Sequence, residues 1–425
     1  MKSHVGYINN STIYTLFYII CLGQIVLQTY VPVLQFWDET LTVLFLLLII
    51  SRLLKDRKSI NIHYYYMLAL IVILAIIGLY GNLRYKIQTS PAPILNDLGN
   101  CFKVYIAYIG SCLYFSNVKI GHITMIRTIR KSANFTRVLI LIMFVFAVIN
   151  LFVDIGMRQE YRFGIPTFQF IIGGSGNFSN FFFPIMLILT MDYYCCRNRK
   201  NRQIFIITAL LVWASALRVR GLVHIFMYIV ICYYVIHLKK QKFNIFIVLF
   251  CLSIIYFIAI NQVHYYLDEG TTARYNLLFW GYETAVNCFP IGAGFSTYGT
   301  DAAAKYYSPL YEQYGFENVW GLSSDNPEFA HDNYWPAIMG EFGFVGIVFT
   351  ILLVYLLMKD FFRLAGETNY MKALAYFASF VLLFQSTGSP VFFHYITVCI
   401  MIILSFLFSC NIKTKKNTLA EWHGR

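Results

Sequence analysis

The sequence predicts an all-α fold, a polytopic transmembrane helical bundle of about twelve spans. Of the 425 residues, 59% are hydrophobic and only 12% are charged, about half the charged fraction of an average soluble protein. Apolar runs long enough for helices recur from end to end, separated by short polar clusters. The alternating segments of roughly ten residues that build a membrane β-barrel are absent. Helices satisfy their own backbone hydrogen bonds in lipid and are therefore the expected spanning elements.

The apolar runs also predict the position and orientation of each span. Lys and Arg concentrate in alternate connections, which predicts that both termini are cytoplasmic by the positive-inside rule. The net charge of +13 therefore reflects orientation in a lipid bilayer rather than nucleic-acid binding. The expected spans are centred near residues 13–33, 40–52, 64–80, 104–117, 138–156, 178–194, 204–217, 222–237, 243–261, 336–358, 370–386 and 392–410.

Three parts follow from this pattern: residues 1–261 with nine spans, 262–335 as a long polar segment on the outer face, and 336–425 with three spans and a cytoplasmic tail. The polar segment is rich in tyrosine and carries Trp280, Trp320 and the turn sequence PIGAGFSTYG, so a small helical cap is expected. No GxxxxGK[ST] motif occurs, which predicts chemistry without ATP. The ten cysteines show no CxxC or His/Cys spacing, so neither a disulfide framework nor a zinc site is predicted.

Two arginines, Arg218 and Arg220, interrupt the apolar pattern between the seventh and eighth spans. These spans are only about 14 and 16 residues long, or roughly 21–24 Å, which is short of a hydrocarbon core of about 30 Å. We therefore expect the arginines to lie recessed on a hairpin tip, where guanidinium groups bind phosphate oxygens in pairs. The alternative is that both side chains extend to the outer headgroups.

Three further arginines lie on the outer side. Arg274 begins an expected helix, TTARYNLLFWGYETAV, for which Thr271 or Thr272 is the candidate N-cap. Arg158 and Arg162 lie at the outer end of the fifth span. They either pair with the acidic residues beside them or line the same mouth as the recessed arginines.

A histidine lies at the outer end of the tenth span, in the stretch FAHDNYW. A neutral imidazole at His331 is suited to accept a proton from a hydroxyl group near neutral pH. Asp332 either orients this imidazole or caps the helix, and Asn333 follows it. Glycines at three-residue spacing in GEFGFVG predict the close approach of a neighbouring helix. The competing histidines are His224, His264 and His394.

These motifs, in this order, resemble the O-antigen polymerase and O-antigen ligase family. The resemblance rests on Arg220-Gly221, on Arg274 with Trp280 and PIGAGF, and on HDNYW with GEFGFVG, and it covers roughly residues 200–360. Two departures are evident. The family more often has His-Asn where this chain has His331-Asp332, and Ser-Arg-Gly where it has Val219-Arg220-Gly221.

The resemblance implies a GT-C-like bundle and a metal-independent glycosyltransferase without a cofactor. The donor is a glycan on undecaprenyl diphosphate, Arg220 and Arg274 stabilise the leaving diphosphate, and His331 acts as the base that activates the acceptor hydroxyl. Inversion at the donor sugar follows from a single displacement. The further residues expected to bind the substrate are Arg218, Arg158, Arg162, Asp332, Asn333, Tyr334, Tyr298 and Trp320, and other loop aromatics, Tyr306, Tyr307 and Tyr311, are expected to stack on sugar rings.

Polymerase and ligase differ only in the acceptor. A polymerase of O-antigen, capsule or exopolysaccharide is the first expectation, acting in the cytoplasmic (inner) membrane with its site on the periplasmic or outer face, where lipopolysaccharide and capsule precursors are assembled. A ligase that moves the glycan to a terminal acceptor is the alternative. A flippase of lipid-linked oligosaccharide is a third, although flippases usually show two similar halves, which this chain lacks. A chain-length regulator is the protein partner that the resemblance implies.

Overall fold

A computed structural model describes residues 10–27, 31–55, 60–117, 122–162, 164–172, 175–195, 200–240, 243–267 and 272–414. The structure is 77% helical. A single antiparallel pair of strands, β1 (Arg158–Arg162) and β2 (Ile165–Phe168), is present in the described part of the chain. The helical fold class expected from the sequence is therefore confirmed.

Every expected span overlaps a helix. These helices are α1 (Asn10–Leu27), α2 (Trp37–Lys55), α3 (Ile62–Tyr85), α4 (Pro91–Asn117), α5 (His122–Phe152), α6 (Ser175–Tyr194), α7 (Lys200–Ala214), α8 (Val219–Ile231), α9 (Ile245–Leu267), α13 (Tyr334–Ala365), α14 (Asn369–Ser386) and α15 (Tyr395–Thr414). A short 3-10 turn, η1 (Pro32–Phe36), precedes α2, and a π-helical segment, η3 (Cys232–His237), extends α8.

Five helical stretches in the described residues are long and apolar enough to cross a membrane. They are Val33–Lys55, Ile62–Tyr85, Ile123–Phe152, Val219–His237 and Tyr334–Ala365. Large apolar side chains on these helices face outward, for example Val138, Val145 and Phe152 on α5. Such continuous exposed apolar faces are typical of a protein that is surrounded by lipid. The structure therefore supports a helical membrane protein.

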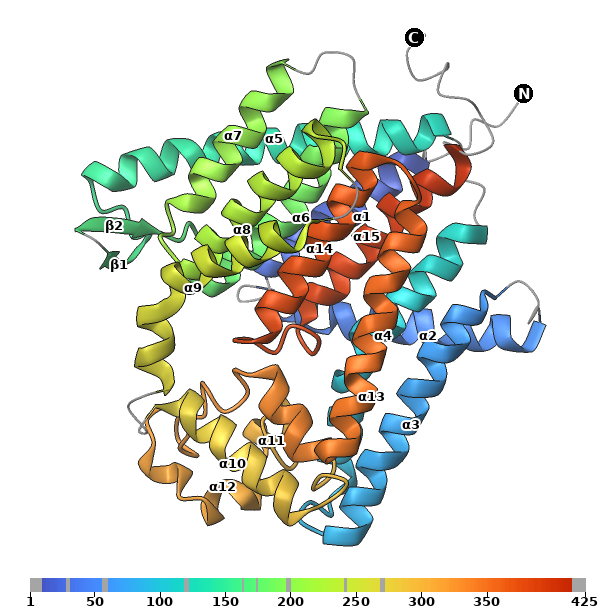
Figure 1. The fold of residues 1–425 in the computed structure, drawn as a ribbon, viewed down its shortest axis with the longest axis vertical. Helices are drawn as coiled ribbons and strands as arrows, with labels where there is room; N and C mark the ends of the chain where they lie inside the picture. The colour runs from blue at the N-terminus through green and yellow to red at the C-terminus, as the bar shows by residue number, and fades with distance from the viewer. Residues whose placement is uncertain are drawn as a thin grey trace.

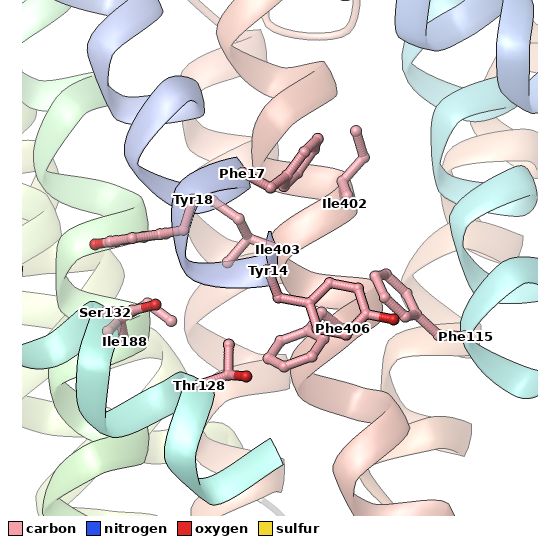
Figure 2. Close-up of a pocket in the computed structure, with 10 residues that line it drawn as sticks. All are labelled: Tyr14, Phe17, Tyr18, Phe115, Thr128, Ser132, Ile188, Ile402, Ile403 and Phe406. Atoms are coloured by element: carbon pink, nitrogen blue, oxygen red, sulfur yellow. The ribbon is translucent and has the colours of Figure 1, made fainter. Parts of the chain in front are cut away.

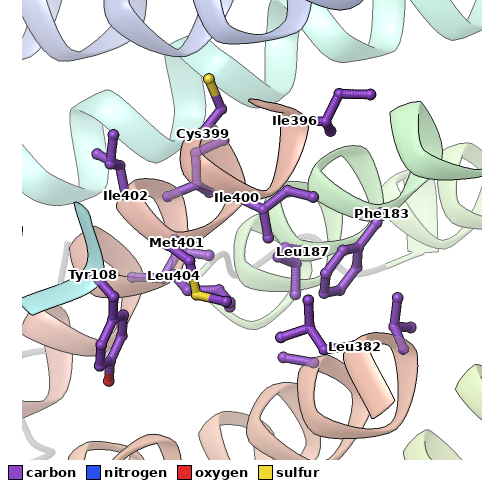
Figure 3. Close-up of a cluster of buried hydrophobic side chains, with 14 of the residues drawn as sticks. Tyr108, Phe183, Leu187, Leu382, Ile396, Cys399, Ile400, Met401, Ile402 and Leu404 are labelled. Carbon is purple, nitrogen blue, oxygen red and sulfur yellow. The ribbon is translucent and has the colours of Figure 1, made fainter. Parts of the chain in front are cut away.

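The bundle core lies where α4, α6, α14 and α15 meet. Figure 3 shows Tyr108 of α4, Phe183 and Leu187 of α6, Leu382 of α14 and a row of side chains of α15 directed toward one another. These side chains are almost completely buried. Burial on all sides makes α15 a central helix of the bundle, and its central place agrees with its almost uniformly apolar sequence.

The segment between α9 and α13 forms a helical cap with its own core. It contains α10 (Ala273–Asn287), α11 (Asp301–Lys305), α12 (Pro309–Gln313) and a 3-10 turn, η4 (Phe316–Asn318). Thr272 caps α10, and its hydroxyl accepts from the amide of Tyr275 at 3.4 Å, so the second of the two candidate N-caps is confirmed. Figure 1 shows α10, α11 and α12 gathered at one end of the molecule, beside α13 and the end of α3.

A turn of the cap is inserted into α13 where this helix is interrupted. Gly343 has φ 63° and ψ −164°, which breaks the helix. The break leaves the carbonyl oxygens of Gly340 and Glu341 available, and they accept from the amides of Ala293 and Gly294 at 2.8 and 2.9 Å. Glycine spacing in α13 therefore permits the close approach of the PIGAGF turn, where the sequence had predicted a neighbouring helix.

Two buried carboxyl groups fasten the same turn to the bundle. Asp97 of α4 accepts from the amide of Ser296 at 2.5 Å, and Glu341 of α13 accepts from the amide of Thr297 at 3.2 Å. The hydroxyl of Thr300 lies 3.1 Å from Asp97 and 3.0 Å from Glu341. Both carboxyl groups are almost fully buried and lie within 4.8 Å of each other and of the thiol of Cys101. Because two adjacent buried carboxyl groups do not both ionise, they share one proton.

Substitutions of Glu341 test this clamp. Glu341→Ala leaves the amide of Thr297 without its acceptor and is expected to cost about 1–3 kcal/mol of stability. Glu341→Gln retains an acceptor oxygen and supplies an N–H to Asp97 in place of the shared proton, so its stability should stay close to that of the wild type. Thermal unfolding of the purified protein in detergent measures both. An equal loss of stability in the two variants would contradict the shared proton.

Candidate active site

Arg220 lies in the first turn of α8, at the boundary between the bundle and the cap. The turn between α7 and α8 passes through Leu217, whose φ is 47°, and Arg218 is the N-cap residue of α8. The Nη2 atom of Arg220 donates to the carbonyl oxygen of Gly388 at 2.5 Å. Gly388 lies in the connection between α14 and α15, so this contact joins two parts of the chain that are distant in sequence.

Arg274 approaches the same connection from the cap. Its Nε and Nη2 atoms both donate to Oδ2 of Asp332, at 3.2 and 2.8 Å. The pair is about one quarter to one third exposed. One role expected for Asp332 was that of the helix N-cap. This expectation is wrong, because the N-cap residue of α13 is Asn333. In the structure Asp332 holds the guanidinium of Arg274.

The two arginines meet beside Gly388. A Cβ atom placed on this glycine would lie 3.5 Å from Nη2 of Arg220 and 3.9 Å from Nη1 of Arg274. Two guanidinium groups from α8 and α10 therefore face one small volume next to the connection between α14 and α15. Paired guanidinium groups favour an anionic ligand, and their planar shape matches phosphate or carboxylate oxygens.

His331 lies in the turn that leads into α13. Its Nδ1 atom is buried, and no hydrogen-bond partner for it is found among the described residues. His331 directly precedes Asp332, whose carboxylate binds the guanidinium of Arg274. His331 is therefore a neighbour of the arginine pair, with an imidazole that has a ring nitrogen not engaged by the surrounding protein.

Asn333 and Tyr334 follow His331 at the start of α13. Asn333 is 7% exposed, and its Oδ1 atom likewise has no partner among the described residues. Tyr334 is fully buried, and its hydroxyl lies 3.2 Å from that of Tyr105 in α4. Tyr334 thus packs α13 onto the bundle, whereas Asn333 presents a polar group beside His331.

The other predicted arginines form a separate cluster around the β1–β2 hairpin. Arg162 pairs with Glu160 at 2.9 Å and donates to the carbonyl oxygen of Leu217 at 3.2 Å. Arg218 lies 3.8 Å from the same carboxylate. Arg158 donates to the carbonyl oxygen of Asn150 at 2.6 and 3.0 Å. These contacts tie the hairpin to the turn that carries Arg220, so this cluster supports the site from outside.

The predicted aromatic residues of the cap divide into buried and exposed groups. Tyr298 is fully buried, and its hydroxyl donates to the carbonyl oxygen of Leu277 at 2.7 Å. Burial raises the pKa of this phenol well above its ordinary value, so it remains a neutral donor. Tyr311 is also fully buried, whereas Trp320 is 75% exposed and Tyr306 is 42% exposed. Only exposed rings of this kind offer a face to a sugar.

Three residues that lie near the site were not singled out from the sequence. Gly388 lies in STGSP, which reads as an ordinary turn, and His394 was one histidine among several. Lys103 lies within the apolar run CFKVYIAYIG, where a buried lysine is itself a signal of function. Its ammonium group lies 2.9 Å from Asp38, and its charge also acts on His394.

Two other features of the described residues are distinct from this site. A pocket lined by Tyr14, Phe17, Phe115, Ile402 and other residues of α1, α4, α5, α6 and α15 is shown in Figure 2. Its cavity volume of about 30 Å³ is far below the roughly 300–1,000 Å³ of ordinary ligand pockets, so it is too small for a glycan. The group Asp97, Cys101 and Glu341 has ligand atoms suited to a metal ion, but amides of the cap already donate to both carboxyl groups.

Comparisons with known proteins leave the family open: no protein-family model and no curated protein matches this sequence. The resemblance to O-antigen polymerases and ligases therefore rests on the motifs alone.

Proposed function

We propose that this protein is a membrane-embedded glycosyltransferase that polymerises an O-antigen, capsule or exopolysaccharide. It transfers the growing glycan from undecaprenyl diphosphate to a lipid-linked repeat unit. The observation that carries this proposal is the convergence of Arg220 and Arg274 beside Gly388, with His331 as a neighbour. Arginines within a largely apolar helical protein point to a functional site, and two planar guanidinium groups side by side match the oxygens of a phosphate. A diphosphate on a lipid carrier offers such oxygens and reaches this site from the bilayer.

The chemistry is a single displacement at the anomeric carbon of the donor sugar. A hydroxyl oxygen of the acceptor attacks this carbon, and its proton passes to the imidazole of His331. The bond between the anomeric carbon and the diphosphate oxygen breaks, and the electron pair leaves with undecaprenyl diphosphate. Arg220 and Arg274 stabilise the charge that develops on the leaving oxygen. Attack from the opposite face inverts the configuration, and the guanidinium groups supply the charge that a metal ion supplies in other enzymes.

The proposal includes the full membrane arrangement. Twelve helices cross the cytoplasmic membrane, both termini are cytoplasmic, and the cap lies on the outer face. The overlap of every expected span with a helix and the outward-facing apolar side chains support this arrangement. The exposed rings of Trp320 and Tyr306 stack on sugar units of the acceptor or of the growing chain.

The test is transfer by the purified protein in lipid vesicles. Undecaprenyl-diphosphate-linked repeat unit isolated from the source cells is added without another acceptor. The expected product is a ladder spaced by the mass of one repeat unit, together with released undecaprenyl diphosphate, and EDTA should not affect it. A His331→Ala preparation, which lacks the proposed base, is the matched control and should form no ladder.

Other outcomes would redirect the assignment. Transfer that occurs only after addition of a terminal acceptor would show a ligase. Movement of intact lipid-linked oligosaccharide across the vesicle bilayer, without a new glycosidic bond, would show a transporter and remove the proposal.

A further inference from the structure

The connection between α14 and α15 lies against the arginine pair and also contributes a hydrogen-bond acceptor to it. It runs from Thr387 to His394, and the carbonyl oxygen of Gly388 accepts from Arg220. Among the contacts between described residues, this carbonyl oxygen accepts from Arg220 and the carboxylate of Asp332 accepts from Arg274. We propose that the carbonyl oxygen of Gly388 holds the position of a diphosphate oxygen, and that the absent side chain of Gly388 leaves room for that anion between Arg220 and Arg274.

The surroundings of Gly388 differ from those of the glycines that the fold requires. A Cβ atom on Gly292 or Gly343 would come within 2.4–2.5 Å of backbone atoms of another segment, so these glycines are needed for packing. Gly388 is not among the glycines with a positive φ, and among the described residues a Cβ atom there would meet only the two guanidinium groups, at ordinary contact distances. Neither backbone conformation nor packing against other protein atoms therefore demands a glycine at this position. A side chain at this position would instead occupy the space beside the guanidinium groups of Arg220 and Arg274.

Exchange of these oxygens for a diphosphate is energetically reasonable. The carbonyl of Gly388 is neutral and offers one oxygen to Arg220, whereas a diphosphate offers several charged oxygens. A phosphate accepts two parallel hydrogen bonds from one guanidinium group, and its negative charge adds an attraction that a neutral carbonyl lacks. The turn itself is held by its own contacts, since the amide of Gly388 and the hydroxyl of Ser389 both donate to the carbonyl oxygen of Gln385, at 3.1 and 3.0 Å. It can therefore release Arg220 while remaining attached to α14.

This inference rests on the proposed function only for the identity of the anion as a lipid-linked diphosphate. The site itself is tested by binding, without glycan transfer. Inorganic pyrophosphate is the first probe, and the thermal unfolding of the full-length protein in detergent is the readout, because a ligand that binds the folded state raises Tm with its concentration. Farnesyl diphosphate is the second probe and distinguishes a lipid-linked from a free diphosphate.

The decisive pair of variants is Gly388→Asp and Gly388→Asn, which differ in charge and hardly in size. The aspartate places a carboxylate between Arg220 and Arg274. We expect Gly388→Asp to unfold at a higher temperature than Gly388→Asn when no probe is added, and this gap should shrink at high salt. Gly388→Asp should also lose the response to pyrophosphate that the wild type shows. Equal unfolding temperatures, with a wild-type response in both variants, would overturn the inference.

A third variant, Gly388→Ala, makes a smaller change that should not disturb folding. Gly388→Ala is sterically tolerated, and its methyl group should weaken pyrophosphate binding by about tenfold, as expected when a hydrogen bond to a charged group is lost. Unchanged affinity in Gly388→Ala would also overturn the inference. Farnesyl diphosphate should act at a lower concentration than pyrophosphate, and a response to pyrophosphate alone would overturn the lipid-linked source.

The two proposals fail separately. If pyrophosphate binds and Gly388→Asp abolishes this binding, but no glycan is transferred, the anion site stands and the transferase does not. If Gly388→Asp transfers glycan at the wild-type rate, the transferase stands and the role of Gly388 does not.

Discussion

Replacing Arg274 with alanine is expected to reduce glycan transfer by about 100- to 1,000-fold, the usual loss when one preorganised charge is removed from a developing anion. The reason is positional: the guanidinium of Arg274 lies beside that of Arg220 at Gly388. Arg274→Lys should recover only part of the activity, because an ammonium group does not present two parallel donors. Measurement of the initial rate of ladder formation at saturating donor compares the variants.

Asp332 provides the matched control for this prediction. Asp332→Asn removes the carboxylate that Arg274 contacts at 2.8 Å but retains the guanidinium. A partly exposed ion pair contributes about 0–1 kcal/mol to stability, so neither variant should unfold at a clearly lower temperature. We expect Asp332→Asn, which removes the group that positions Arg274 but not the guanidinium itself, to lose less activity than Arg274→Ala. Normal transfer by Arg274→Ala would exclude the arginine pair from the reaction.

The largest expected effect on stability is at Gly343. Its φ of 63° and ψ of −164° lie in a region that is open essentially to glycine alone, and a Cβ atom would lie 2.5 Å from the amide nitrogen of Gly292. Gly343→Ala should therefore cost about 2–6 kcal/mol, as a sum of backbone strain and steric overlap. Against a typical total stability of about 5–15 kcal/mol, this loss should sharply lower the yield of folded protein and its Tm.

A glycine on another helix serves as the control. Gly99 lies in α4, and a Cβ atom there would meet nothing within 4 Å. Gly99→Ala should leave Tm unchanged or raise it slightly, because alanine favours the helix by about 0.5–1 kcal/mol. If Gly343→Ala unfolded at the same temperature as Gly99→Ala, α13 would not be interrupted as the structure describes.

The helices were predictable from the sequence because lipid imposes a simple rule on composition. Long apolar runs such as that of α3 have one structural solution in a membrane. The break in α13 was not predictable in the same way. Gly340, Gly343 and Gly346 have the spacing of a helix-packing face. The structure shows that a turn of the cap lies against Gly340 and Gly343, whereas Leu74 of α3 lies nearest to Gly346 from another helix.

The candidate site was predictable only where charge stood out against an apolar background. Arg220 is a charged residue between two apolar runs, and this position led to a functional hypothesis. Gly388 contributes a carbonyl oxygen and an absence of side chain, but the sequence does not show that this glycine lies beside the two guanidinium groups. Tyr298 was predicted to bind the substrate, but it is buried in the core of the cap. The sequence alone does not distinguish a buried tyrosine from one that contacts a sugar.

The fastening of the PIGAGF turn has a consequence for the order in which the protein assembles during synthesis. Asn82 of α3 exchanges hydrogen bonds with the backbone of Phe295, at 2.8 and 2.9 Å, and Asp97 of α4 and Glu341 of α13 accept from the residues that follow. Two of these partners leave the ribosome long before the turn, and one leaves after it. The cap therefore cannot form all of these hydrogen bonds until α13 has been made, and Arg220 gains its contact with Gly388 only after the connection between α14 and α15 has been made.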